Sequence, residues 1–380
     1  MIYFDNAATS YPKPPETARA VYNSIIKYGG NPGRSGHRMS LNAAKVVYDM
    51  REKAATFFGI NDAERVIITK NCTESLNIAI FSIMKNGGNV IVSNFEHNSV
   101  MRPLEYMKKK NICNYKIAKV SFENPVITAH EFERLVDTET KMILCTHASN
   151  VTGRIAPITE LSEICRRRNL IFCVDASQTA GIIPINMLSD GIDILCCPGH
   201  KGLFGPTGTG LLVTNQKITL SPIMYGGTGS SSANLDQPEF LPDLAESGTV
   251  NVTGAAGLSA GISFINSVGI ERIYSHELSL ARYFYKKISQ MPHILLYSNA
   301  PDINRSVSTI SFNVKGKAST DVADYLDKHN IAVRSGLHCS PMAHNFIGTR
   351  DTGTVRASFS FFNTPKEIDY ICNVLEKYKN

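Results

Sequence analysis

The 380-residue sequence lacks several features that would assign it to a familiar class. It has no long uncharged apolar stretch, and residues 1–6 contain no basic segment followed by an apolar one. We therefore expect neither a membrane span nor a signal peptide. The formal net charge is only +6, from 39 basic and 33 acidic residues. The one local run, 108–110, is typical of a solvated helix end, with an acidic partner as the alternative. Composition therefore predicts no nucleic-acid or membrane partner.

The cysteines also lack the spacing of a metal site. None of the nine forms a Cys-x-x-Cys pair or a His/Cys cluster with zinc-ligand spacing, so we expect no metal. Five lie in apolar, strand-like runs, where a small buried hydrophobe is the ordinary interpretation: Cys113, Cys145, Cys173, Cys196 and Cys197. This pattern predicts a reducing, cytoplasmic location. Only Cys339 has an unusual setting.

Apolar strand-like runs alternate with helix-like segments from about residue 40 to residue 215. We predict strands at 65–69, 89–93, 141–146, 170–175, 192–197 and 210–213, and helices between several of them at 41–58, 74–84 and 159–168. The alternation predicts an α/β fold in which a mostly parallel sheet is sandwiched by helices. Ligands of such sheets bind beyond the carboxyl ends of the strands.

The second part of the chain has a different pattern. Residues 225–248 are rich in Gly, Ser and Pro, which indicates a long functional or inter-domain loop. Helical segments at 255–267 and 270–290 and a strand at 307–313 then predict a smaller α+β C-terminal domain. We place an N-terminal segment that joins the small domain at 1–14, the large domain at 15–255, and the small domain, with the Cys339 loop, at 256–380.

Lys201 is the most informative residue of the chain. It lies in a loop rich in Gly and Pro, residues 199–208, and Asp175 ends an earlier predicted strand. In pyridoxal phosphate (PLP) chemistry a lysine forms a Schiff base with the aldehyde, and an aspartate keeps the pyridine nitrogen protonated. Taken singly, a loop lysine is usually solvated and an aspartate often closes a strand. A phosphate-binding loop fits poorly, because residues 211–213 indicate a strand and no Gly-Lys-Ser/Thr follows.

A phosphate contact is expected where strand 65–69 turns into the next helix. The turn offers free backbone N–H groups and the positive end of a helix dipole. Asn71 and Glu74 also form a capping-box pattern, so a helix cap and a phosphate site are both open and can coexist. Thr73 offers a hydroxyl group to the same site.

Three further polar residues follow predicted strands. His97 is expected to stack on the cofactor ring and later to move protons at the reacting carbon, with a helix-capping or surface histidine as the alternative. Asn150 and Gln178 are each expected to hydrogen-bond the phenolic oxygen of the cofactor. Both residue types are also common turn formers, so each is a weak signal by itself.

The second strong motif surrounds Cys339, in residues 334–341. Its thiol lies between His338 and Pro341 in a loop that we expect to be exposed, where a nearby imidazolium or arginine can favour the thiolate. Arg356 follows in a strand-like run, and a guanidinium is the natural bidentate partner of an amino-acid carboxylate. The alternative is a structural thiol and an arginine in a salt bridge.

Together these motifs resemble the cysteine desulfurase family, PLP enzymes of the class-V aminotransferase type with fold type I. The segments that carry the resemblance span nearly the whole chain: 2–10, 96–99, 149–153, 174–178, 199–201, 205–208, 246–249, the Cys339 loop and 354–358. The short Arg-x-Gly-x-His-Cys-x-Pro loop is similar to that of the group with the Suf-type desulfurases and selenocysteine lyase-like enzymes.

The resemblance implies a homodimer with its active sites at the subunit interface, PLP as cofactor and L-cysteine or L-selenocysteine as substrate. Lys201 then abstracts and returns protons, and the Cys339 thiolate takes the sulfur as a persulfide, with release of alanine and with a sulfur-acceptor protein as a further partner. The implied cofactor contacts are Cys72, Thr73, His97, Asn150, Asp175, Gln178, His200, Lys201 and, from the neighbouring subunit, Thr249. The implied substrate contacts are Arg334, Arg356 and Asn150.

The sequence departs from the family pattern at three positions. Pro198 stands where many relatives have a serine that holds the phosphate, Leu337 replaces the first histidine of a His-His-Cys, and Cys72 stands where a threonine or small residue is common. With Pro198 the phosphate contact must come from elsewhere, and with Leu337 the tuning of the thiolate is open. Separately, another PLP-dependent reaction, transamination or β-elimination, stays open, with Cys339 incidental, as does a non-catalytic sulfur carrier. Residues 226–230 with Gln237 and Pro238 also resemble a less characterised branch, in which the substrate is open.

Overall fold

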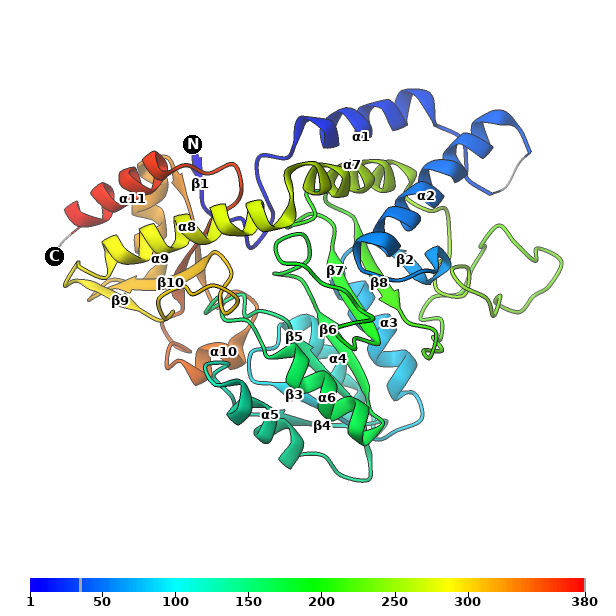
Figure 1. Cartoon of the computed structure of the whole chain (residues 1–380), viewed down its shortest axis with the longest axis horizontal. Helices are drawn as coiled ribbons and strands as arrows, with labels where there is room; N and C mark the ends of the chain where they lie inside the picture. The colour runs from blue at the N-terminus through cyan, green and yellow to red at the C-terminus, as the bar shows by residue number, and fades with distance from the viewer. Residues whose placement is uncertain (34–35, 379–380) are drawn as a thin grey trace.

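The computed structural model, which describes residues 1–33 and 36–378, contains two main sheets and a third sheet of two short strands (Figure 1). The larger has seven strands, in the order β2-β8-β7-β6-β5-β3-β4. Their bounds are β2 Val66–Thr69, β8 Gly210–Thr214, β7 Ile194–Pro198, β6 Ile171–Asp175, β5 Thr140–Thr146, β3 Asn89–Ser93 and β4 Asn114–Ala118. Within the described part of the sheet only β8 runs against the others. The mostly parallel α/β sheet predicted from the alternation is confirmed.

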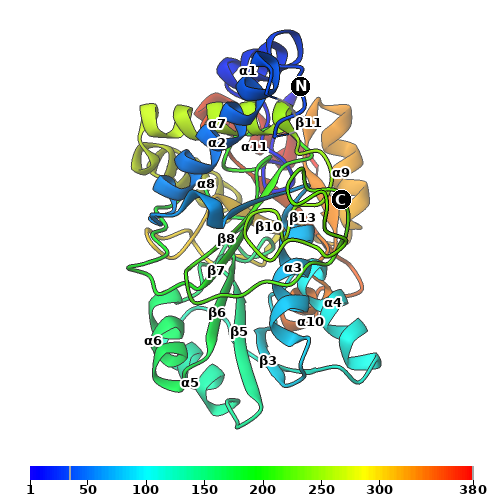
Figure 2. The ribbon, with the colours of Figure 1, turned by 90° about the vertical axis from the view of Figure 1, so that its right-hand side faces the viewer.

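Helices cover both faces of this sheet because its strands are apolar on both sides. In β3, Ile91 belongs to one buried cluster, and Val90 and Val92 belong to the other, as the two-residue period of a strand requires. One face is covered by α2 (Arg38–Phe57), α5 (Pro125–Arg134), α6 (Ile158–Arg168) and α7 (Val252–Val268), and the other by α3 (Cys72–Met84) and α4 (Asn98–Lys109). Figure 2 shows α5 and α6 on one side of the sheet and α3 on the other.

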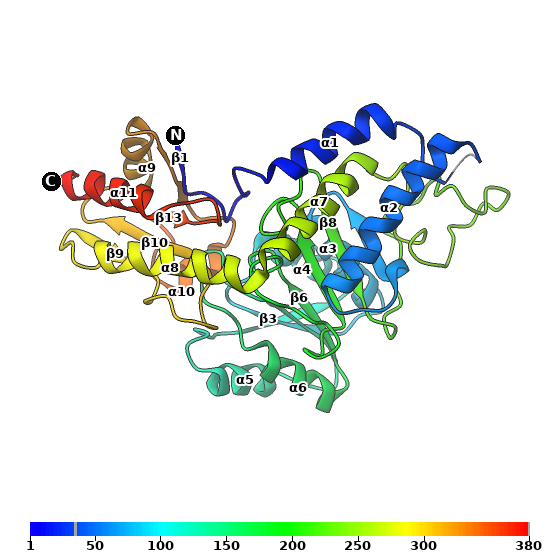
Figure 3. The same cartoon turned by 45° about the horizontal axis from the view of Figure 1, so that its top comes forward.

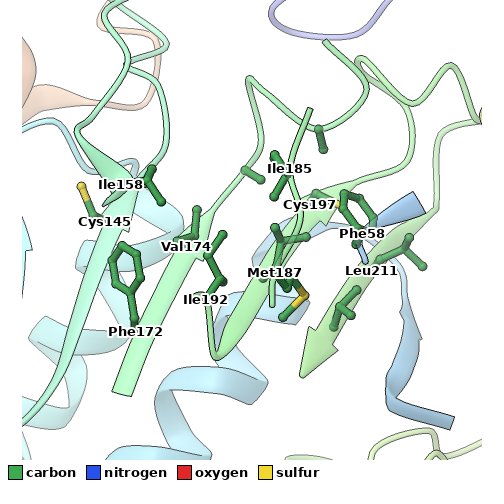
Figure 4. Close-up of a cluster of buried hydrophobic side chains, with 14 of the residues drawn as sticks. Phe58, Cys145, Ile158, Phe172, Val174, Ile185, Met187, Ile192, Cys197 and Leu211 are labelled. Carbon is green, nitrogen blue, oxygen red and sulfur yellow. The ribbon is translucent and has the colours of Figure 1, made fainter. Parts of the chain in front are cut away.

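The cysteines of the sheet are part of its core. Cys145 and Cys197 lie in the cluster drawn in Figure 4, whereas Cys173 and Cys196 face the opposite layer. All nine cysteines lie in the described residues, and all except Cys339 are buried. The prediction that the strand cysteines act as small buried hydrophobes is confirmed.

The small domain is a four-stranded antiparallel sheet in the order β12-β13-β10-β9. These strands are β12 Arg334–Gly336, β13 Thr354–Ser358, β10 Thr309–Val314 and β9 Ile294–Leu296, with helices α8 Ile270–Ile288, α9 Ser319–Lys328, α10 Pro341–Phe346 and α11 Pro365–Lys377. The short strand β1 (Ile2–Tyr3) pairs in parallel with β11 (Ile331–Ala332), and Phe4 is buried in the small-domain core. The first residues of the chain therefore pack with the last third of it.

Helix α7 packs with the large domain. It lies against α1 (Pro15–Lys27) and α2, as Figure 3 shows, and its buried side chains join the larger core cluster. The glycine at position 269, which has φ of 90°, then separates α7 from α8. We propose that the domain boundary lies at Gly269, so that residues 256–268 belong to the large domain. A short 3-10 turn, η1 (Ala63–Arg65), precedes β2. The helices of residues 1–33 and 36–378 include none with the length and apolar character of a membrane span.

Candidate active site

Five of the residues singled out from the sequence lie where strands of the large sheet end. Asp175 is the last residue of β6, and Lys201 lies in the loop that follows β7. Cys72 begins α3 directly after β2, and His97 is the N-cap of α4, after β3. Asn150 follows β5. The strands β2, β3, β5, β6 and β7 run in the same direction, so their carboxyl ends lie at one edge of the sheet.

Lys201 is the basic centre of this edge. Burial lowers the pKa of Lys201 to about 8, and Asp175 partly opposes this change while Arg356 adds to it. Among the described residues, no hydrogen bond is found for its Nζ, although its carbonyl oxygen accepts from the Ser10 hydroxyl and the Phe204 N–H. An amine with this pKa is partly neutral near pH 7 to 8, as nucleophilic attack on an aldehyde requires.

Asp175 is fixed by two donors on one oxygen. Its side chain is 2% exposed, and its Oδ1 accepts from the Ser177 N–H at 2.9 Å and from the Cys72 Sγ at 3.5 Å. Burial raises the pKa of Cys72 well above its usual range, so the thiol keeps its proton and can donate it to the carboxylate. The side chain of Cys72 thus contacts Asp175, which leaves only its backbone for a phosphate.

Two helix N-termini lie side by side at this edge, those of α3 and α4. The Asn71 side chain accepts from the Glu74 N–H at 3.0 Å, so the predicted cap is present. The Thr73 hydroxyl lies 2.7 Å from the hydroxyl of Ser99, which belongs to the first turn of α4. The two positive helix ends and two hydroxyl groups together favour an anion.

His97 is the helix cap that the sequence left open as an alternative, and its stacking on a cofactor stays a prediction. Its Nδ1 accepts from the Ser99 N–H at 3.1 Å, so the ring caps α4. Burial, with a contribution from Lys201, lowers the pKa of His97 to about 4, so the ring is neutral at pH 7. A neutral ring held at its Nδ1 still offers its face and its Nε2 to a ligand.

The N-terminal segment is hydrogen-bonded to the backbone of the Lys201 loop. The His200 carbonyl accepts from the Ser10 N–H at 3.2 Å, the Thr9 hydroxyl at 3.1 Å and the Lys13 Nζ at 2.5 Å. The Ser10 hydroxyl also donates to the Lys201 carbonyl at 2.8 Å. We call Thr9, Ser10 and Lys13 the N-terminal clamp. It fixes the backbone from which the Lys201 side chain extends.

Gln178 and His200 are also engaged with this region. The Gln178 Nε2 donates to the Ala7 carbonyl at 3.1 Å, so its amide oxygen has no part in that bond. Burial lowers the pKa of His200 to about 4, and its buried Nδ1 has no partner among the described residues. A buried polar atom without a partner is rare in proteins and indicates a missing water or ligand.

The Cys339 loop brings an exposed thiol to the same edge. The Cys339 carbonyl accepts from the Asn98 N–H at 2.8 Å, which places the loop beside the N-terminus of α4. His338 and Cys339 both have left-handed backbone conformations, with φ of 49° and 56°. Such a pair is costly for residues other than glycine, and its persistence at a reactive side chain fits a functional site.

Arg334 is the cation beside the thiol, and His338 is not. Arg334 Nη2 lies 4.0 Å from the Cys339 Sγ. His338 is 3% exposed, and its Nε2 contacts the Thr354 hydroxyl at 3.1 Å. Burial and nearby Arg356 lower the pKa of His338 to about 2, so the ring carries no charge. Of the two activating groups considered from the sequence, the structure supports the arginine.

Arg356 and Asn150 connect the thiol loop to the large domain. The Asn150 Nδ2 donates to the His338 carbonyl at 2.8 Å, and its Oδ1 accepts from the Ser340 hydroxyl at 2.8 Å. Both polar atoms of the amide therefore hold the loop, a role that the sequence did not indicate. Arg356 Nη1 donates to the Asn150 carbonyl at 3.2 Å, and its buried Nε has no partner among the described residues.

Thr249 lies apart from the other predicted site residues, and the site contains several residues that were not predicted. Thr249 is exposed at the end of the 225–248 loop, and a contact with a neighbouring subunit lies outside a single chain. The residues that sequence reasoning missed are Asp5, Ser10, Lys13, Asn98, Ser99 and Ser177. Residues 2–10 were recognised as a motif, but nothing local indicated what their side chains contact. No group of three His, Cys, Asp or Glu side chains in residues 1–33 and 36–378 can hold a metal.

Comparisons with known proteins agree with this geometry. The family model for aminotransferase class-V matches residues 2–371. A probable cysteine desulfurase of Methanothermobacter thermautotrophicus is 32% identical over 99% of this chain and 94% of its own length, and one of Pyrococcus abyssi is 31% identical with the same coverage. The apo structure of a cysteine desulfurase from Thermococcus onnurineus superposes with a TM-score of 0.90 at 32% identity, covering 99% of this chain and 94% of that one. The chain therefore belongs to the class-V aminotransferase family and, within it, to the cysteine desulfurases that the motifs resemble.

Proposed function

We propose that this protein is a PLP-dependent cysteine desulfurase that takes sulfur from L-cysteine, leaving a persulfide on Cys339 and releasing L-alanine. One observation carries the proposal: a half-buried amine beside a buried carboxylate and an exposed thiol are held at the same edge of one sheet. Lys201 and Asp175 supply the first pair, and the Cys339 carbonyl is bound to the N-terminus of the helix that His97 caps. The printed names of the relatives support the same activity.

The residues at this edge fit PLP. Lys201 offers an amine without a hydrogen-bond partner among the described residues, and Asp175 offers a buried carboxylate for the ring nitrogen. The ends of α3 and α4, with Thr73, suit the phosphate, while His97 and Gln178 suit the ring face and its phenolic oxygen. When bound, the cofactor supplies an electron-accepting ring. The Asp175 carboxylate is held by a neutral thiol and one N–H, which leaves its negative charge for a cationic partner.

The protein's own side chains then divide the work. Arg356, with its unpartnered Nε, binds the substrate carboxylate. Lys201 Nζ takes the proton from the substrate Cα and can return it, because its pKa is near 8. The Cys339 sulfur attacks the substrate sulfur, so that an S–S bond forms, the C–S bond breaks, and the carbon is protonated. Thiol plus cysteine gives persulfide plus alanine, which balances without an external oxidant.

Surface features support two further parts of the proposal. Large apolar side chains are exposed on α1, α2 and the loop after β8, which lie on one side of the molecule in Figure 1 and suit a homodimer in which Thr249 reaches the neighbouring cofactor. They are Tyr22, Ile25, Ile26, Leu41, Tyr48, Met224, Tyr225 and Leu235. A persulfide on exposed Cys339 is open to a sulfur-acceptor protein. The free cysteines support a reducing, cytoplasmic location.

The test is a reaction of the purified holoenzyme with L-cysteine, in which alanine is quantified and persulfides are mapped by peptide mass spectrometry. We expect alanine to form in step with a persulfide on Cys339. Pyruvate in place of alanine, or alanine without modification of Cys339, contradicts the proposal. The same measurement with L-selenocysteine shows which chalcogen the site prefers.

A further inference from the structure

Arg356 already holds a carboxylate in this structure, and it belongs to the protein. Its Nη2 donates to the Asp5 Oδ1 at 2.8 Å. Arg356 is 2% exposed at its side chain, whereas Asp5 is 21% exposed. A buried guanidinium needs a counter-charge, because removing it from water without one is costly. Asp5 therefore supplies the charge that an amino-acid substrate would bring.

A second arginine makes the charge balance incomplete. Arg334 lies directly opposite Arg356 in the antiparallel pairing of β12 and β13. Like charges at such paired positions repel each other. Asp5 is the one carboxylate that forms an ion pair with either arginine among the described residues, so two positive groups share one negative group. The site thus has room, electrostatically, for one more carboxylate.

Asp5 is held in a way that lets its side chain leave. Only Oδ1 contacts Arg356, whereas an arginine and a carboxylate can form two parallel bonds. The Asp5 backbone is fixed separately: its carbonyl accepts from the Ala8 N–H at 3.0 Å, and the residue forms a β-bridge with Ser358. A rotation of one side chain therefore releases Arg356 without moving the chain.

Arg356 also keeps its position when Asp5 turns away. Its backbone is part of β13, paired with β10 and β12 on both sides, and its Nη1 still donates to the Asn150 carbonyl. The free Nε and the released Nη2 then face an incoming carboxylate as a two-donor edge.

We propose that Asp5 is a specificity-determining residue that occupies Arg356 in place of the substrate carboxylate and is displaced when the substrate binds. This inference rests on the proposed function for the identity of the substrate. Asp5 keeps the buried arginine neutralised between turnovers and admits only ligands whose carboxylate competes with its own. It weakens binding of every carboxylate substrate in inverse proportion to the fraction of time that Arg356 is free of Asp5.

The experiment compares wild type with Asp5→Asn by calorimetric titration of the holoenzyme with L-alanine and with L-alaninol, which lacks the carboxylate. If Asp5 holds Arg356 nine-tenths of the time, Asp5→Asn binds alanine about 10-fold more tightly. Alaninol binding changes less than about twofold, because it makes no bond to Arg356. With L-cysteine, KM falls in the same proportion and kcat does not rise.

Two variants serve as controls. Asp5→Glu keeps a carboxylate and should bind alanine as wild type does. Asp302→Asn removes an exposed carboxylate that lies 3.3 Å from Arg282, and it should change the affinity for neither alanine nor alaninol. A purely orienting Asp5 predicts the opposite result, namely weaker alanine binding and a raised KM in Asp5→Asn. Three results each overturn the inference: weaker alanine binding in Asp5→Asn, unchanged alanine binding, and failure of Asp5→Asn to fold. A wild type that makes no alanine from cysteine instead refutes the proposed function, because alanine binding is measured without turnover.

Discussion

Lys201 and Cys339 are the two reactive side chains of the proposed site, and their surroundings differ. Lys201 is half-buried in the large domain, its loop is held by the N-terminal clamp, and burial lowers its pKa to about 8. Cys339 is exposed, its loop has two left-handed residues, and Arg334 Nη2 lies 4.0 Å from its Sγ. Under the proposed function this difference suits a division of labour, in which a half-buried amine with a lowered pKa exchanges protons and an exposed thiol delivers sulfur to another molecule.

Replacement of Lys201 should lower activity more than replacement of Cys339. We expect Lys201→Ala to lower alanine formation by roughly 10³-fold or more, because it removes both the attachment point and the proton carrier. The visible absorption of the bound cofactor should be lost or displaced. Lys217→Ala, which changes an exposed lysine, is the matched control. Near-normal turnover in Lys201→Ala would show that the base lies elsewhere.

Replacement of Cys339 should strongly lower sulfur transfer but leave cofactor binding intact. We expect Cys339→Ala to keep the cofactor absorption but to lower persulfide and alanine formation by about 100-fold or more. Activity on L-selenocysteine should fall less, because selenium leaves carbon more easily. Cys113→Ala, in which a buried thiol is removed, serves as the control. A persulfide on another cysteine in the Cys339→Ala protein would contradict this assignment.

The pKa of Lys201 should be visible in cofactor uptake. Only the neutral amine attacks an aldehyde, so the rate of PLP capture by cofactor-free protein should rise with pH and level off above about 8. Asp175 raises the pKa of Lys201, so Asp175→Asn should move the plateau to lower pH. The measurement is the initial rate of absorbance change from pH 6 to 10. A rate that still rises at pH 10 would mean that the amine is not shifted.

Glu277 on α8 offers the smallest and most indirect effect. It lies near Lys201 around a cavity of about 30 Å³, and burial raises its pKa from 4.5 to about 8, with Ser308 opposing the shift. The folded protein then binds more protons than the unfolded chain between pH 4.5 and 8, so stability falls as pH rises through that window. We expect Glu277→Gln to reduce the loss between pH 5.5 and 8 by about 3 kcal/mol in denaturant unfolding. Glu271→Gln, exposed on the same helix, should change nothing.

The large sheet was predictable because its strands are buried on both faces. Such strands are continuous apolar runs, and the predicted ranges agree with the structure to within about two residues. Elements with weaker patterns escaped, and β4 and α4 show why. Strand β4 (Asn114–Ala118) is at the sheet edge and mostly half-exposed, so its pattern is weak. Helix α4 carries Pro103, a residue that normally argues against a helix interior.

The site was predictable only where its signals are local. Lys201, Asp175, His97 and Cys339 stand out because each lies in a distinctive short motif. The partners of these residues did not, because they come from far away in the chain: Asp5 and Arg356 are 351 positions apart, and Ser10 and Lys201 are 191 apart. The direction of His338, which turns from the thiol to Thr354, depends on packing that no single segment encodes.

The pairing of β1 with β11 also sets the order in which a growing chain can complete the site. Ile2 pairs with Ile331, and Asp5 pairs with Arg356. During synthesis the large domain has all its strands once Thr214 has emerged, whereas the first residues must wait for the last third of the chain. The protein can therefore fold its sheet before release from the ribosome, but its catalytic centre is among the last parts to be assembled.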